Sequence, residues 1–183
     1  MQITILNGAP DPGENDLAHF TTFITEVAGA GNEIQYFPLA NMQIKHCTGC
    51  WTCWWKTPGL CIWQDDADTI FESVINSDLV VFASPILAGF TSSLLKRLQD
   101  RLIVLIHPYI QLVQGECHHR KRYDSYPDFG LLLSKDADSD EEDIQIITDI
   151  YKRLALNFHC QLKHVWINPT PKQKETTHDI SHY

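Results

Sequence analysis

The sequence has no long hydrophobic segment. Its longest apolar run, near Ile103–Ile106, is far shorter than the roughly 20 residues that a membrane-spanning helix needs. No basic stretch precedes the first strand pattern, MQITILNG, so we expect no secretory signal peptide. The expected compartment is therefore the cytoplasm, where cysteines stay reduced and serve as ligands or reactive groups. We expect no membrane partner.

Basic residues are also scarce, because 14 Lys and Arg stand against 23 Asp and Glu and give a formal net charge of −9. Nucleic acid needs a basic surface for its phosphates, so a nucleic-acid partner is not expected. The length of 183 residues and the 44% share of hydrophobic residues favour one globular domain. We expect this domain to span residues 1–167 and a polar tail to follow at 168–183.

Strand-like and helix-like patterns alternate along the chain. Short β-rich or continuously apolar runs predict five strands, at Gln2–Asn7, Glu33–Leu39, Asp78–Ala83, Phe129–Ser134 and Cys160–Ile167. Helical spacing of apolar residues predicts helices at 15–28, 65–75, 92–106 and 144–158, and a long connection at 107–128. This order predicts an α/β fold with a flavodoxin-like, doubly wound, five-stranded parallel sheet of strand order 2-1-3-4-5.

In such a sheet, ligands bind beyond the carboxyl ends of the strands, where the strand order reverses. The loops at this place are Gly8–Asn15, Ser84–Thr91 and the stretch after Ser134. A glycine-bearing loop before a helix offers backbone N–H groups and a favourable dipole to a phosphate. The pattern therefore makes these three loops the place to look for a ligand.

Four of the six cysteines lie within fifteen residues, in an irregular segment at 40–64. They follow the spacing C-x2-C-x2-C-x7-C at Cys47, Cys50, Cys53 and Cys61. Four thiolates suit a [4Fe–4S] cluster or a tetrahedral zinc ion, and free thiols or a redox pair are the third reading. Four tryptophans close by could shield a cluster or pack on a neighbouring subunit: Trp51, Trp54, Trp55 and Trp63.

Several motifs, in order, resemble one known family. They are Gly8 and Pro10 with Asn15, the run Cys47-Thr-Gly-Cys-Trp-Thr-Cys53, Cys61, Asp65-Asp66, Ser84-Pro85, Leu95-Lys96 and Asp100-Arg101. Up to about residue 101 the chain resembles the NAD(P)H-dependent FMN reductases, and more narrowly the iron–sulfur flavoproteins. The resemblance implies bound FMN and electrons from NAD(P)H or a protein donor, and it leaves a [4Fe–4S] cluster on the four cysteines as one of the three readings. It also implies a small-molecule or protein redox partner and a homodimer or homotetramer.

The resemblance further implies which residues hold FMN. They are Gly8, Ala9, Pro10, Asn15 and Asp16 in the first loop, Ser84, Pro85, Ile86, Leu87, Ala88, Gly89 and Phe90 in the second, and Ser134 and Lys135 in the third. The family usually has an aromatic residue at the position of Leu87, so Phe90 is the candidate for stacking on the flavin.

The first loop departs from the family pattern in charge. Ala9 replaces a Ser, Asp11 replaces an Arg and Asp16 replaces a Thr, and Glu14 adds another carboxylate. A carboxylate about 4 Å from a phosphate charge costs on the order of 1 kcal/mol in water and about 4 kcal/mol at an effective dielectric constant of 20. This loop therefore opposes the phosphate that the family would place there.

We therefore predict an FMN-dependent NAD(P)H oxidoreductase or electron-transfer flavoprotein, with the cysteine loop as a second relay near the strand ends. No catalytic acid or base is expected, because the flavin does the chemistry. The alternative is a degenerate flavodoxin-like protein without flavin that acts as a metal-binding or interaction module. Two charged runs are expected to balance each other: the basic patch His118–Arg122 and the acidic Asp136–Asp143, a solvated loop with a helix N-terminus.

Overall fold

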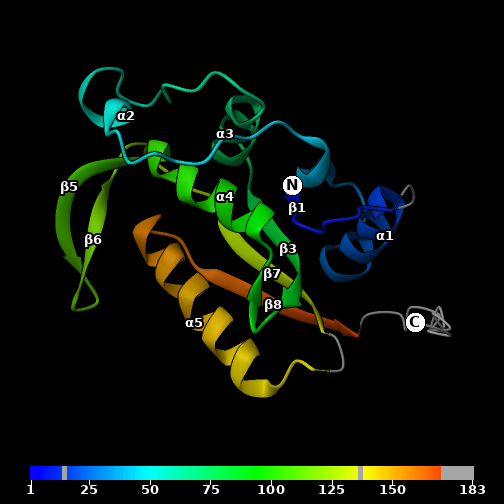
Figure 1. Cartoon of the computed structure of the whole chain (residues 1–183). Helices are drawn as coiled ribbons and strands as arrows, with labels where there is room; N and C mark the ends of the chain where they lie inside the picture. Colours follow the sequence, from blue (N-terminus) through cyan, green and yellow to red (C-terminus); the bar gives the residue numbers. More distant parts are fainter. Residues whose placement is uncertain (14–15, 136–137, 170–183) are drawn as a thin grey trace, which may run out of the picture.

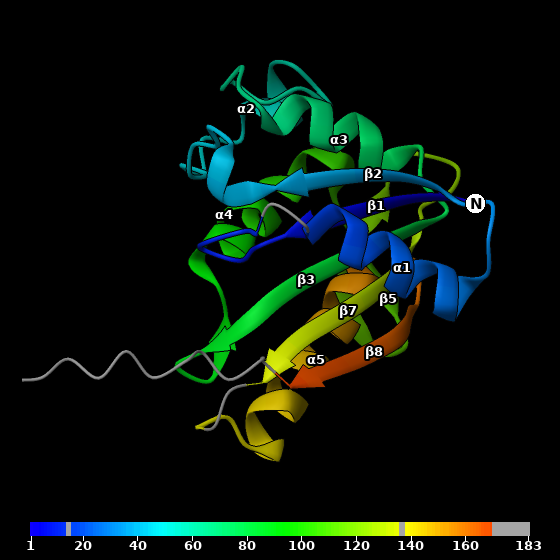
Figure 2. The same ribbon diagram turned by 90° about the vertical axis from the view of Figure 1, so that its right-hand side faces the viewer.

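The computed structural model describes residues 1–13, 16–135 and 138–169. Its central sheet has five parallel strands in the order β2-β1-β3-β7-β8, which confirms the predicted order 2-1-3-4-5 (Figure 2). The strands are β1 (Gln2–Asn7), β2 (Glu33–Pro38), β3 (Leu79–Leu87), β7 (Asp128–Lys135) and β8 (Leu162–Pro169). A short strand, β4 (Phe90–Thr91), pairs antiparallel with the end of β3.

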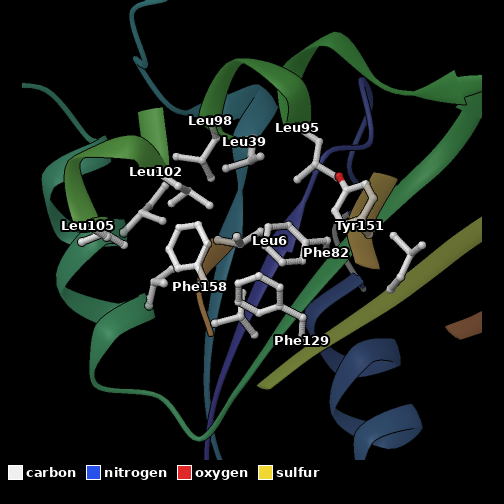
Figure 3. Close-up of a cluster of buried hydrophobic side chains, with 14 of the residues drawn as sticks. Leu6, Leu39, Phe82, Leu95, Leu98, Leu102, Leu105, Phe129, Tyr151 and Phe158 are labelled. Carbon is white, nitrogen blue, oxygen red and sulfur yellow. The ribbon is translucent and has the colours of Figure 1, made fainter. Parts of the chain in front are cut away.

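Helices cover both faces of this sheet. They are α1 (Asp16–Ala28), α3 (Ala67–Ile75), α4 (Ser93–Arg101) and α5 (Glu141–Asn157). The larger core lies between the sheet and α3, α4 and α5, and its centre is shown in Figure 3, where Phe82 and Phe129 meet Tyr151 and Leu95. The smaller core lies on the other face under α1, whose Ile24 is fully buried against β1 and β3. The three central strands β1, β3 and β7 are therefore largely buried on both faces, as a parallel sheet requires, whereas the edge strands β2 and β8 are partly exposed.

The strand register brings the predicted loops together. Asn7 at the end of β1 lies beside Ala83 of β3, and Pro85 of β3 lies beside Ser134 of β7. The carboxyl ends of these three strands therefore meet at one edge of the sheet. This convergence is the geometry on which a flavin site in this fold depends.

The segment 84–91, predicted as a loop, is mostly strand. β3 continues to Leu87, and a two-residue turn with positive φ at Ala88 (50°) and Gly89 (74°) leads into β4. Positive φ at both central residues is typical of the tight turns that match the twist of a β-hairpin. The correction follows from this turn, because it lets Ile86 and Leu87 pair with Phe90 and Thr91.

The predicted connection at 107–128 holds a β-hairpin, and the helix predicted to run to residue 106 is shorter. α4 ends at Arg101, a 3-10 turn η2 (Leu102–Leu105) follows, and β5 (Ile106–Val113) pairs with β6 (Glu116–Lys121). The turn between them has positive φ at Gln114 (52°) and Gly115 (86°). Figure 1 shows this hairpin projecting beside the main sheet.

Three further boundaries refine the prediction. The segment at 40–64 starts in a 3-10 turn, η1 (Leu39–Asn41), and contains a short helix, α2 (Thr52–Trp55). α5 starts three residues before the predicted 144, because Asp140 and Asp143 form a reciprocal capping box. β8 ends at Pro169, so the predicted tail loses its first two residues to a strand, and 170–183 lie outside the described residues. Within the described ranges, no helix is long and apolar enough to cross a bilayer.

Candidate functional site

The first candidate loop starts at Gly8, which packs tightly against α4. Its N–H donates to the Ala83 carbonyl at 2.8 Å. A Cβ at this position would lie 2.7 Å from Ser92 Oγ and 2.8 Å from Leu95 Cβ. Gly8 is therefore needed for the close approach of the loop to the start of α4, independently of any ligand.

The next residues of this loop are only partly available to a ligand. The Ala9 N–H donates to Asn7 Oδ1 at 3.0 Å, and Asn7 Nδ2 donates to the Tyr36 hydroxyl at 2.8 Å. Pro10 and Asp11 are exposed. Of the remaining predicted FMN contacts in this loop, Asn15 lies outside the described residues and Asp16 is the first residue of α1.

The second segment is rigid and internally bonded. The Ser84 side chain is buried, donates to the Pro85 carbonyl at 2.8 Å and accepts the Ser92 N–H at 2.9 Å. Phe90 is partly buried against the larger core, whereas Leu87 is 44% exposed. Ile86 is buried, and Ala88 and Gly89 form the turn. Ser84 therefore holds the second segment against α4. At this edge of the sheet, the segment would present backbone groups and small side chains to a flavin.

The third segment brings a cation that is already paired. Lys135 Nζ lies 3.0 Å from Glu141 Oε1, and Ser134 is partly buried. Asp140, Glu141, Glu142 and Asp143 form the start of α5, so the helix N-terminus predicted for this acidic run is confirmed for these four residues. The third segment thus contains one lysine that could pair with a phosphate, and Glu141 already neutralises part of its charge.

These observations decide how the edge fits FMN. Three chain segments converge on it, as the isoalloxazine end of the cofactor requires. The phosphate end fits less well, because residues 8–13 include no Lys or Arg and include the exposed Asp11. The edge therefore brings together the three segments that a flavin ring would need, but its described residues offer little to a phosphate.

The second candidate site is a cavity of about 60 Å3 lined by all four clustered cysteines. A volume of this size holds about four to six water molecules. Cys47 and Cys50 are exposed, Cys53 and Cys61 are partly buried, and all four are free thiols. The other lining residues include Trp51, Trp63, Arg101, Ile103 and Val104. The fold therefore gathers the predicted ligands around one space.

The thiols in this cavity have different acidities. Hydrogen bonds from the Thr52 hydroxyl and the Thr52 backbone N–H lower the pKa of Cys50. Burial raises the pKa of Cys53, and the charges of Cys61, Cys47 and Cys50 raise it further. Such mutual effects require the four sulfurs to lie near one another. A bound cation would relieve this repulsion, because metal ligation favours the thiolate form.

Zinc and a cubane cluster require different arrangements of the same thiols. Tetrahedral zinc needs all sulfurs about 2.3 Å from one ion, whereas in a cubane each thiolate binds its own iron and the sulfurs lie farther apart. Within 1–13, 16–135 and 138–169, no three His, Cys, Asp or Glu side chains surround a point as one ion would need. The donor set of four thiols in one cavity fits a cluster in its chemistry.

The short helix α2, which carries Cys53, is anchored by its neighbours. The Trp54 indole N–H donates to the Ile103 and Ile106 carbonyls at 3.1 and 3.0 Å. Arg122 Nη2 donates to the Cys53 carbonyl at 3.4 Å. The His119 ring lies 5.0 Å from the Trp54 ring. Part of the basic patch at 118–122 therefore packs on the cysteine loop, and its expected pairing with the acidic run, in the same or another subunit, stays a prediction.

The base of the cysteine loop is closed by carboxylates. Asp66 Oδ2 accepts the Gln43 N–H at 2.6 Å, and Asp65 Oδ2 accepts the Lys45 N–H at 2.9 Å. Burial would raise the pKa of Asp65, but bonds from the Lys45 N–H and the Arg101 guanidinium outweigh it and hold this pKa below its ordinary value. The Asp65-Asp66 motif therefore joins the two ends of the loop.

Arg101 is the residue of this site that sequence reasoning left without a role. Its side chain is 1% exposed and forms an ion pair with Asp65 at 2.6 Å. The available signal was its position on α4, three residues after Leu98 on the apolar stripe that faces the core. A charged residue on such a stripe indicates a buried partner.

The two sites lie at opposite ends of α4 within one chain. Ser92, at its start, bonds to Ser84 at the edge of the sheet where the three strand ends meet, whereas Arg101, at its end, lines the cysteine cavity. A helix of nine residues spans about 13 Å. Figure 1 shows α2 near one end of α4 and the end of β3 near the other. The loop that was expected near the strand ends is therefore displaced from them by the length of this helix.

Comparison with known proteins gives several matches. An iron–sulfur flavoprotein of Methanocaldococcus jannaschii is 31% identical over 101 residues, which cover 55% of this chain and 51% of the relative. One of Archaeoglobus fulgidus is 30% identical over 100 residues, which cover 55% and 44%. The chain spans about half the length of these curated relatives.

Solved structures show the same fold at low sequence identity. An azoreductase from Bacillus anthracis superposes with a TM-score of 0.61 at 11% identity, covering 91% of this chain and 85% of that one. An NAD(P)H:quinone oxidoreductase from Methanothermobacter marburgensis superposes with a TM-score of 0.58 at 15% identity, covering 96% and 90%. The family model described as NADPH-dependent FMN reductase matches residues 1–120. With that match over well over half of its length, the chain belongs to the NADPH-dependent FMN reductase family, a family of flavoprotein oxidoreductases.

Proposed function

We propose that the chain is an FMN-dependent NAD(P)H oxidoreductase or electron-transfer flavoprotein that also carries a [4Fe–4S] cluster. The observation that carries the cluster is the single cavity lined by Cys47, Cys50, Cys53 and Cys61. The observation that carries the flavin is the convergence of three strand ends at one edge of the sheet. The names of the matched relatives, iron–sulfur flavoproteins, support the same combination.

The residues of the edge would divide the work of holding FMN. The ring would lie along the backbone of Ser84–Phe90, which the Ser84 hydroxyl fixes to the start of α4. The phosphate would lie at Gly8–Pro10 and the start of α1, with Lys135 as the nearest described cation of the third segment. When bound, flavin supplies hydride acceptance and one-electron transfer. The protein contributes position and charge, and none of its residues is proposed as a catalytic acid or base.

The substrates and partners belong to this proposal. The electron donor would be NAD(P)H, and the acceptor a small molecule or a redox protein. We further propose a homodimer or homotetramer. The β5–β6 hairpin supports self-association, because Tyr109, Ile110 and Leu112 are 59%, 50% and 74% exposed. Light scattering of the purified protein measures this directly, and a monomer at micromolar concentration contradicts the self-association proposal.

Anaerobic purification followed by absorption spectroscopy tests both cofactors. We expect flavin bands that extra FMN strengthens, together with the broad shoulder of an iron–sulfur cluster. A variant with Ser at Cys47, Cys50, Cys53 and Cys61 should lose the shoulder and keep the flavin bands. NADH or NADPH should bleach the flavin bands of either protein. A protein that shows neither flavin nor cluster absorption after incubation with FMN, iron and sulfide and removal of the unbound reagents contradicts the proposed function.

A second candidate is a flavin-free member of the family that acts as a metal-binding or interaction module. The observation that favours it is the first loop, where Asp11 is exposed and the Ala9 N–H is already bonded to Asn7. Titration with FMN and with riboflavin separates the two candidates. Equal affinity for both ligands would show that the phosphate contributes nothing, and no affinity for either supports the flavin-free module.

A further inference from the structure

Arg101 is the most deeply buried charge next to the cysteine cavity. It lies in the last turn of α4, and the whole residue is 2% exposed. Burying an ion pair costs desolvation that the attraction between its partners often only offsets, so such a pair is weak support for stability alone. The pair between Arg101 and Asp65 therefore suggests a task besides holding the fold together.

The guanidinium joins both ends of the cysteine loop. Nη1 donates to Asp65 Oδ1 and Oδ2 at 2.7 and 2.6 Å, and to the Lys45 carbonyl, before Cys47, at 3.3 Å. Nη2 donates to the Trp63 carbonyl, after Cys61, at 3.3 Å. One rigid, planar group thus fixes the chain on both sides of the four cysteines.

The same group faces the cavity. Arg101 is one of its lining residues, together with the four cysteines. Its Nε–H is buried and, among the described residues, has no hydrogen-bond partner. A buried N–H without a partner costs free energy, so a sulfur acceptor in the cavity would satisfy it.

We propose that Arg101 is a positioning residue for the cluster, an inference that rests on the proposed iron–sulfur site. It fixes the two ends of the cysteine loop through Lys45 and Trp63, and it supplies positive charge and an N–H to the thiolates. Asp65 orients the guanidinium and opposes part of its charge. Hydrogen bonds to the sulfurs and net charge set the reduction potential of a cluster, so both residues act on that potential.

The chain offers a matched control on the same helix. Arg97 lies one turn earlier and donates to the Ile44 carbonyl at 3.2 Å, at the start of the same loop. It does not line the cavity described above. Arg97→Gln therefore removes an equal charge and one loop contact without removing a group from the cavity.

The first measurement uses the full chain without cluster, so that it does not depend on the cofactor. Arg101→Gln should speed amide hydrogen exchange across 45–65 by roughly tenfold, because charged hydrogen bonds to the loop ends are lost. Arg97→Gln should change it less, and Arg101→Lys should lie between Arg101→Gln and wild type. Exchange in Arg101→Gln equal to that of wild type overturns the positioning role.

The second measurement uses protein reconstituted anaerobically with iron and sulfide. Arg101→Gln should weaken iron retention about 10- to 100-fold, as losses around a metal site do, and move the reduction potential to more negative values. Asp65→Asn should move the potential in the opposite direction, and Arg101→Lys should stay near wild type. Opposite shifts do not follow from general disruption, and shifts of the same sign overturn the electrostatic part. If wild type takes up no iron while exchange responds as expected, the cluster proposal fails, and of the role proposed for Arg101 only the fixing of the two loop ends stands.

Discussion

The loop after β1 and the loop after β2 belong to one sheet but differ in how well they match their expected tasks. The cysteine loop has all four cysteines around one cavity, and Asp65, Asp66 and Arg101 hold its two ends together. The first loop keeps Gly8 but has Asp11 exposed and no cation in its described residues. The comparison shows that a fold can keep the backbone of a binding site while the charges at that site change sign.

The largest expected effect is the loss of a cysteine ligand. Cys50→Ser should lower iron retention by at least about 100-fold, because changes outside the ligand set already cost 10- to 100-fold. Iron and sulfide analysis after anaerobic gel filtration measures the loss. Cys117→Ser is the matched control, since Cys117 is also exposed and lies outside the cavity. Equal iron content in both variants would contradict ligation by Cys50.

The next effect is a difference in alkylation rate between a thiol of the cysteine loop, Cys50, and a buried thiol outside it, Cys160. Burial raises the pKa of Cys160 to about 12, whereas bonds from Thr52 lower that of Cys50. The thiolate is the reactive form, and weaker nucleophilicity at low pKa offsets about half of the advantage, so alkylation of Cys50 should be at least about 30-fold faster near neutral pH. The Cys160 rate should keep rising with pH well beyond the range in which Cys50 levels off. Mass spectrometry of cluster-free protein gives both rates, and comparable rates refute the assigned difference.

A smaller effect tests the first loop, whose exposed carboxylate opposes a phosphate. Asp11→Asn should tighten FMN binding about fivefold, because removing one unit charge about 4 Å from the phosphate is worth on the order of 1 kcal/mol in water. The gain should shrink as salt is added. Glu33→Gln removes the same charge at the start of β2, at the opposite ends of the strands, and should leave the affinity unchanged. Fluorescence titration measures both, and an equal gain in both variants would mean that only net charge matters.

The smallest effect concerns the third segment. Glu141→Gln should free Lys135 and tighten FMN binding by about twofold, since an exposed ion pair is worth under about 1 kcal/mol. Riboflavin, which lacks the phosphate, should bind the variant and wild type equally. A similar gain for riboflavin would place the effect on the ring and not on the phosphate.

Much of the fold followed from the sequence, because its signal is burial. Runs such as Leu79–Ala83 are buried on both faces, and their continuous apolar character alone predicts a central strand. The hairpin at 106–121 escaped prediction for the opposite reason. Most residues of its strands are exposed or only partly buried, so they form no continuous apolar run. Its turn has positive φ at Gln114, and glutamine is not a residue that predicts such a turn.

The candidate site was predictable in composition and less so in position. The spacing of Cys47, Cys50, Cys53 and Cys61 was sufficient to indicate a shared cavity. The location of that cavity at the far end of α4 depends on long-range contacts, such as Trp54 with Ile103 and Ile106, that leave no local pattern. The role of Arg101 likewise depends on a partner 36 positions earlier in the chain.

The paired contacts at the base of the cysteine loop have a consequence for how this region can change. Gln43 and Asp66 bond to each other twice, through the Gln43 N–H to Asp66 Oδ2 at 2.6 Å and the Asp66 N–H to the Gln43 carbonyl at 3.3 Å. The chain thus leaves and rejoins the scaffold at a single point, and doubling the intervening length costs only about 0.6 kcal/mol in closure entropy. The exposed parts of 44–65 can therefore change in length with little disturbance of the sheet, whereas the buried Ile44 and Trp54, which join the segment to the core, must be kept.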